Sequence, residues 1–112
     1  MYFLRRAAFL MFLCVGFAGM IASAQSGNAD ADKLFNTARS FITAGDYSNA
    51  VLVLNRAIEL EPQNLEFRKQ LAFTYYLQHD LDKADDIIKT LLTRDDADVQ
   101  TYQIAGDILQ AR

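Results

Sequence analysis

The chain has 112 residues, of which 11 are basic and 14 acidic, and a formal net charge of −3. This length allows one domain. The acidic excess argues against a nucleic-acid surface, which needs clustered Lys and Arg to displace counterions from phosphates, and against electrostatic docking on an anionic membrane.

The charge is unevenly distributed along the chain. Arg5 and Arg6 are the only charged residues before residue 25, and all 14 acidic residues follow. The part after residue 24 therefore carries nine basic and 14 acidic side chains, a net charge of −5.

The first two dozen residues show the three parts of a secretory signal in the expected order. A short positive stretch, 1–6, precedes an uncharged apolar run, 7–22, and small residues stand at Ala22 and Ala24, where a signal peptidase reads the chain. We therefore expect a signal peptide over residues 1–24, cleavage before Gln25, and export. The style of the signal indicates a bacterial protein and a periplasmic destination.

Two other interpretations of this segment stay open. An uncleaved helix would anchor the protein in the membrane, although the 16 apolar residues fall short of the roughly 20 that a spanning helix needs. A lipoprotein signal would use Cys14, although Phe12 and Leu13 precede it where lipidation requires small residues. Cys14 is the only cysteine, so the cleaved chain could form no disulfide.

After a polar linker, 25–29, apolar residues recur at helical spacing with regular breaks. The pattern predicts five helices: from Asp30 to about residue 44, over 47–60, from Asn64 to about 78, over 81 to about 93, and from 99 to the end. Strand signals are missing, so we expect an all-α fold, and the short connections imply antiparallel neighbours.

Local signals mark the ends of these helices. We predict five N-terminal caps, whose side chains can accept hydrogen bonds from the free backbone N–H groups of a first turn: Asp30, Asp46, Asn64, Asp80 and Asp98. Gly45 supplies the left-handed backbone that ends a helix, and Pro62 prevents continuation of the second helix.

The sequence repeats itself at an offset of 34 residues. Small residues align, and so do large apolar ones: Ala38, Ala72 and Gly106; Phe41, Tyr75 and Leu109. Four second-helix positions align in the same way: Ala50 with Ala84, Leu54 with Ile88, Ala57 with Leu91, and Ile58 with Leu92. The small residues indicate helix crossings, where a longer side chain would push the backbones apart.

With these residues the chain resembles the tetratricopeptide repeat family. The first copy matches at Leu34, Thr37-Ala38, Phe41, Ala50, Leu54, Ala57 and Pro62; the second at Leu71-Ala72, Tyr75, Ala84, Ile88 and Leu91; the third at Tyr102, Ala105-Gly106 and Leu109. The resemblance implies an α-solenoid of antiparallel helix-turn-helix repeats over residues 30–112. Repeat one covers 31–64, repeat two 65–98, and a partial repeat three 99–112.

Two positions depart from the family pattern. Arg68 stands where a large apolar residue is usual, which weakens one packing contact. Asp96 stands where proline is usual, so we expect the second helix of repeat two to run about one turn longer.

The residues that could carry chemistry have structural interpretations. His79 occupies the turn position of Gly45, and His tolerates positive φ moderately. A second histidine is missing, so an ordinary zinc site cannot form. The acidic run 95–98 lacks the glycine and the spacing of a calcium loop and is interpreted as a loop followed by a cap. We predict no catalytic residue, cofactor, metal or small-molecule substrate.

The resemblance implies that the first helix of each repeat lines a concave groove where a peptide or helix of a partner protein lies. The register places fourteen positions there: Asp32, Phe35, Arg39, Ile42 and Thr43; Glu66, Lys69, Phe73, Tyr76 and Leu77; Gln100, Gln103, Asp107 and Gln110. We expect six of them to contact the partner: Phe35, Arg39, Ile42, Lys69, Phe73 and Tyr76.

The first two sets contain more apolar and aromatic residues than an exposed helix face should. The alternative interpretation is that Phe35 and Phe73 are additional core residues, pressed against the preceding helix. The family's clamp for C-terminal carboxylates uses Lys and Asn at groove positions, whereas Phe35 and Arg39 stand there in the first copy. Recognition of a chaperone tail is therefore not expected, and a hydrophobic or mixed peptide is.

The last helix keeps several apolar residues, including Tyr102, Ile104, Ile108 and Leu109. Stacked repeats need about three units, and end units carry a polar outer face. Three explanations stay open: the chain is a fragment of a longer repeat array, the last helix is an apolar cap, or two chains self-associate through it.

The expected function is that of an exported adaptor that holds another protein in an envelope assembly. The alternative is a regulatory or docking segment of a longer repeat-containing envelope protein. The residues support no enzyme.

Cleavage before Gln25 would leave 88 residues. We expect mass spectrometry of the exported protein to find Gln25 at the N-terminus. An intact Met1 would contradict cleavage and favour the membrane anchor.

Overall fold

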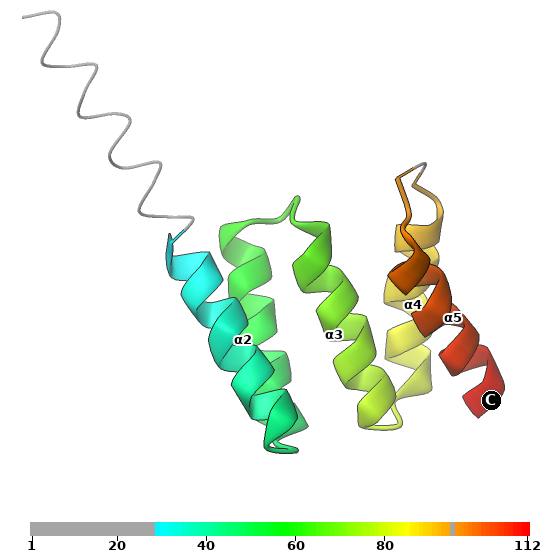
Figure 1. Ribbon diagram of the computed structural model, residues 1–112, viewed down its shortest axis with the longest axis horizontal. Helices are drawn as coiled ribbons and strands as arrows, with labels where there is room; N and C mark the ends of the chain where they lie inside the picture. The colour runs from blue at the N-terminus through cyan, green and yellow to red at the C-terminus, as the bar shows by residue number, and fades with distance from the viewer. Residues whose placement is uncertain (1–28, 95) are drawn as a thin grey trace, which may run out of the picture.

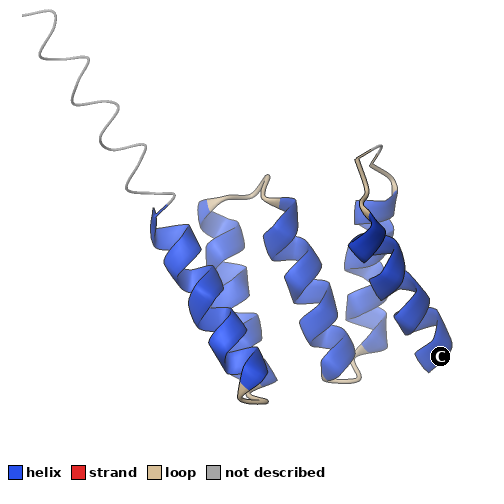
Figure 2. Ribbon diagram, viewed as in Figure 1, coloured by secondary structure: helices blue, strands red, loops and turns tan. Residues whose placement is uncertain are grey.

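The structure is a computed structural model that describes residues 29–94 and 96–112. In these ranges it contains five α-helices and no strand (Figure 2). The helices are residues 29–43, α2 (Tyr47–Leu60), α3 (Leu65–Leu77), α4 (Leu81–Leu92) and α5 (Val99–Ala111). The predicted all-α fold is confirmed. The predicted signal peptide, most of the linker and Asp95 of the acidic run lie outside the described residues.

The helices form two layers (Figure 1). Residues 29–43, α3 and α5 lie in the nearer layer, and α2 and α4 lie behind them. α3 contacts α2, α4 and α5, so each helix pair packs on the next. The result is an open stack of antiparallel pairs. Within the described ranges, no helix combines the length and the apolar character needed to cross a membrane.

Side-chain caps start the last four helices as predicted. Asp46, Asn64, Asp80 and Asp98 each accept a hydrogen bond from a backbone N–H two or three residues further on. The prediction that Asp30 caps the first helix is wrong, because residues 29 and 30 are already helical. Residue 29 is alanine, the strongest helix former, and the helix extends at least that far.

The turns inside the two complete repeats have the same geometry. Gly45 has φ 78° and His79 has φ 64°, both left-handed. In each turn the N–H of this residue donates to the carbonyl of the residue three positions earlier. The N–H of the following Asp donates to the carbonyl five positions earlier, and the N–O distances are 2.9–3.0 Å. This is the Schellman pattern of helix ends. The predicted turn roles of Gly45 and His79 are confirmed.

The prediction that the missing proline lengthens α4 is wrong. α2 has 14 residues and α4 has 12, although the two helices start at equivalent positions. At the end of α4 the Thr93 hydroxyl donates to the Thr90 carbonyl at 2.7 Å, and Arg94 pairs with Asp96 at 3.0 Å. Such local side-chain bonds compete with helical hydrogen bonding, and here they accompany the end of the helix without a proline.

Arg68 has a use that the family pattern does not contain. Its half-buried side chain donates from Nε and Nη2 to the Pro62 carbonyl at 3.2 and 2.9 Å. Arg68 thus ties α3 to the loop that ends repeat one.

The core follows the 34-residue register. The small residues at the predicted crossings are completely buried: Ala38, Ala50, Ala72 and Ala84. The large residues Leu54 and Ile88 occupy equivalent positions and are 0% and 1% exposed. Small residues bring the helix axes together, and these larger side chains fill the space beside each crossing.

Two leucines on α2 allow a matched test of this core. We expect Leu54→Ala to lower the free energy of unfolding by about 2–5 kcal/mol, because it leaves a cavity at a fully buried site. Leu52 is 67% exposed, and Leu52→Ala should change the free energy by about 0.5 kcal/mol or less. Urea unfolding of both variants measures the difference, and equal effects would contradict the packing described here.

Candidate protein-binding face

The first helix contributes one apolar patch with a cation beside it. Phe35 is half-buried, and its ring centroid lies 5.1 Å from that of Phe67 on α3. The exposed Arg39 guanidinium lies 6.0 Å from the Phe35 centroid, a cation–π contact. Ile42 is half-buried one turn further along. The core therefore holds one side of Phe35 in place, while part of its ring and Arg39 remain accessible.

α3 contributes a second patch. The rings of Phe73 and Tyr76 lie 6.2 Å apart at 26°, one helical turn from each other. Both are half-buried and pack against the cluster that contains Ala72 and Ala84. Phe35 and Phe73 thus combine the two interpretations left open by the sequence, since each contacts the core and each keeps an exposed part.

Lys69 lies between acidic partners. The residue is 7% exposed, and its Nζ lies 2.8 Å from a Glu66 oxygen and 2.7 Å from Asp98 Oδ2. Burial disfavours the charged ammonium, but hydrogen bonds and charge attraction from Asp98 and Glu66 outweigh it and raise the pKa of Lys69. The structure therefore gives this predicted groove residue intramolecular partners.

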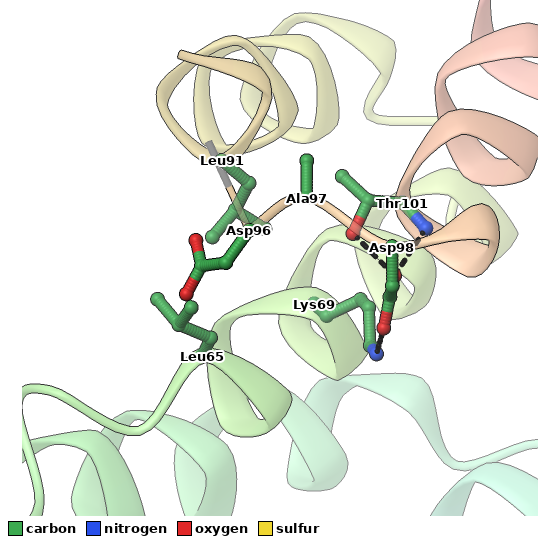
Figure 3. A pocket seen from close by; sticks show the side chains of 7 residues that line it. All are labelled: Leu65, Lys69, Leu91, Asp96, Ala97, Asp98 and Thr101. Atoms are coloured by element: carbon green, nitrogen blue, oxygen red, sulfur yellow. Dashed lines mark hydrogen bonds and ion pairs between the residues drawn. The ribbon is translucent and has the colours of Figure 1, made fainter. Parts of the chain in front are cut away.

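Asp98 joins α3 to the start of α5 (Figure 3). It accepts from Lys69 through Oδ2, and through Oδ1 from the Thr101 N–H at 2.9 Å and the Thr101 hydroxyl at 2.8 Å. The hydrogen bond from Lys69, followed by those from Thr101, lowers the pKa of Asp98 to about 2. One carboxylate thus caps α5 and pairs with a cation on the neighbouring helix.

A family model described as tetratricopeptide repeat matches residues 41–106, more than half of the chain. The chain belongs to the tetratricopeptide repeat family. No curated protein matches it. Tetratricopeptide repeats are in general scaffolds for protein–protein interaction, and at that general level the match supports a protein-interaction scaffold.

The repeat register contained a signal for the Lys69 pair that the sequence analysis missed. Lys69 is equivalent to Phe35, whose ring packs on the core, so a lysine there is expected to be partly buried too. A buried lysine requires an acidic partner. The sequence predicts Asp98 as a cap, but its contact with a residue 29 positions away depends on how repeat two folds back.

The cavity beside this pair is small. Its volume is about 40 Å³, and its walls are Leu65, Lys69, Leu91, Asp96, Ala97, Asp98 and Thr101 (Figure 3). Pockets for drug-sized ligands have volumes of about 300–1,000 Å³, so this one has room for little more than water. Over the described residues, no group of three or more His, Cys, Asp or Glu side chains is arranged to hold a metal ion.

The Lys69–Asp98 pair predicts a component of stability that is sensitive to acid. The folded pKa of Asp98, about 2, lies below its ordinary 3.8, so this component is present above pH 3.8 and is lost as the pH falls through 2. Asp98→Asn keeps a good cap but removes the charge. We expect this variant to be less stable than wild type at neutral pH, with the difference shrinking between pH 3.8 and 2 in urea unfolding.

Asp96→Asn is the matched control. Asp96 lies two residues away, and its ion pair with Arg94 is largely exposed. Loss of this ion pair should therefore lower the free energy of unfolding much less than the loss of the Lys69–Asp98 pair. A wild-type advantage over Asp98→Asn that does not change with pH would contradict a role for the charge.

Proposed function

We propose that the face formed by residues 29–43 and α3 binds a hydrophobic or mixed peptide, or a helix, of a partner protein. The observation that carries this proposal is the partial burial of three aromatic side chains at groove positions of the repeat register, Phe35, Phe73 and Tyr76, with the exposed Arg39 beside the first. Ile42 is a further half-buried apolar residue at such a position on the first helix.

Their partial burial suits these aromatic rings to binding. Phe35 rests on Phe67, and Phe73 and Tyr76 rest on each other and on the core. Side chains that are already ordered lose little conformational entropy when a partner covers them. Large aromatic residues that become fully desolvated supply most of the binding energy at many interfaces.

Charge on this face favours a partner with an acidic group near Arg39. Lys69 is already paired with Glu66 and Asp98, so its ammonium reaches a partner only at the expense of those contacts. Arg39 is exposed, and its guanidinium lies over the uncharged ring of Phe35. We therefore assign partner selectivity to Arg39 rather than to Lys69, which remains a predicted contact.

We further infer that this adaptor acts in a bacterial envelope assembly, in the periplasm. The signal-like sequence of residues 1–24 supports export, and the same segment left uncleaved would make the protein a membrane-anchored scaffold. The alternative role, a docking segment of a longer envelope protein, would use the same face. Self-association through the apolar residues of α5 stays an alternative role for that helix.

Affinity capture with mass spectrometry tests the binding face. The full chain and a Phe73→Ala/Tyr76→Ala variant serve as baits in an envelope extract of the source organism, and captured partners are then titrated. We expect the double variant to bind the true partner at least about tenfold more weakly, because two anchor side chains are lost. Arg39→Glu changes an exposed side chain, so it should weaken the binding of an acidic partner without affecting the fold.

Leu52→Ala is the matched control, since Leu52 is exposed on α2 in the opposite layer. It should retain every partner. Circular dichroism checks that each bait is folded. A partner list and affinities that are the same for wild type, the double variant and Arg39→Glu would overturn the proposed face.

A further inference from the structure

One groove position of the repeat register changes its charge along the stack. Arg39, Phe73 and Asp107 follow one another at intervals of 34 residues, so they occupy the same register position on the first helix, α3 and α5. These helices lie in the nearer layer with α3 in the middle (Figure 1), and α3 contacts both of the others. Because stacked repeats superpose, equivalent residues lie on equivalent sides of successive helices. The position is thus cationic, then aromatic, then anionic.

The charges of Arg39 and Asp107 are not neutralised by each other or by neighbouring side chains. Within the part of the chain that the structure describes, no ion pair involves the exposed Arg39 or the half-buried Asp107. Asp32, the acidic groove residue of the first helix, precedes Arg39 by seven residues, about 10 Å along the helix axis. Lys69, the basic groove residue of α3, already has acidic partners. At this register position the first helix is therefore positive and α5 is negative.

Phe73 separates the two charges by an apolar surface. Its half-buried ring stacks with that of Tyr76 and packs against the core cluster that contains Ile104 of α5. A partner that covers this ring excludes water, and charge interactions become stronger where water is excluded. Arg39 and Asp107 can then contribute more to partner choice than fully solvated surface charges, which salt screens.

We propose that Arg39 and Asp107 select a partner segment that carries both charges. Its acidic group lies at Arg39, an apolar side chain lies on Phe73, and its basic group lies at Asp107. This inference rests on the proposed function, because it takes the binding face as given and extends it to α5. A segment with like charges at both ends would bring one of them against a like charge of the protein, which disfavours its binding.

The stack also sets the spacing of the two charges in the partner. Packed helix axes lie about 8–10 Å apart, so the two steps from the first helix to α5 span about 16–20 Å. An extended segment advances about 3.3 Å per residue, so we expect its acidic and basic residues to be about five or six positions apart. Residues 1–28 of the chain itself contain no acidic residue and lack the group that Arg39 would bind.

Selection from a displayed library of random peptides tests this charge pattern. Peptides of about twelve residues exceed the span, and the full chain is the target. We expect wild type to enrich peptides with one acidic and one basic residue on either side of an apolar residue. Asp107→Lys makes both ends basic and should enrich peptides with acidic residues at both ends. Arg39→Glu makes both ends acidic and should enrich peptides with basic residues at both ends.

A peptide selected by wild type then measures the contribution of the Asp107 charge. Asp107→Asn keeps the shape of the side chain and removes the charge, so the peptide should bind about three- to tenfold more weakly in fluorescence anisotropy at low salt. High salt should reduce this difference, because it screens the charges.

Asp86→Lys is the matched control for Asp107→Lys. It makes the same change at an exposed aspartate of α4, in the opposite layer. It should enrich the same peptides as wild type and bind them with the same affinity. Circular dichroism checks that every variant is folded.

Enriched peptides with the same charge pattern for wild type, Asp107→Lys and Arg39→Glu would overturn the inference. Failure of wild type to enrich any peptide would also overturn it, and a segment of the same chain that occupied these positions would produce that failure. Phe73→Ala/Tyr76→Ala distinguishes the inference from the proposed function. If the double variant loses the peptides but the charge variants leave their pattern unchanged, only the charge selection is wrong. If the double variant keeps the peptides, the proposed face is wrong as well.

Discussion

The close approach of helices at alanine residues is the constraint on which the rest of the structure depends. Ala38 and Ala50 in repeat one, and Ala72 and Ala84 in repeat two, are all completely buried. A larger side chain at any of these crossings would separate the layers, because protein interiors have no spare volume. The crossings recur every 34 residues, and so the same pairing of helices recurs along the stack.

This stacking decides which side chains remain available for binding. The first helices lie side by side in one layer (Figure 1), and two of them carry half-buried aromatic residues. The same arrangement brings Lys69 to Asp98, so that a buried cation on α3 is neutralised by the cap of α5. A lysine at that position without an acidic partner would be costly. The scaffold thus uses Lys69, a predicted groove residue, for its own stability and leaves Arg39 exposed.

The two ends of the stack differ in chemistry. Repeat one presents polar residues where the register would otherwise place buried ones, while α5 presents Val99, Tyr102 and Leu109 around a glycine. Water solvates the first end well and the second poorly.

The sequence by itself determined the helices, four of their five caps, the left-handed turns at Gly45 and His79, and the small residues at the crossings. These features are local or strictly periodic, so neighbouring residues and the 34-residue register contain them. Only the tertiary structure decided that Lys69 meets Asp98, that Arg68 binds the Pro62 carbonyl and that Phe35 rests on Phe67. The register tells which side of a helix a residue occupies, but which neighbour satisfies its charge or fills its space depends on three-dimensional packing.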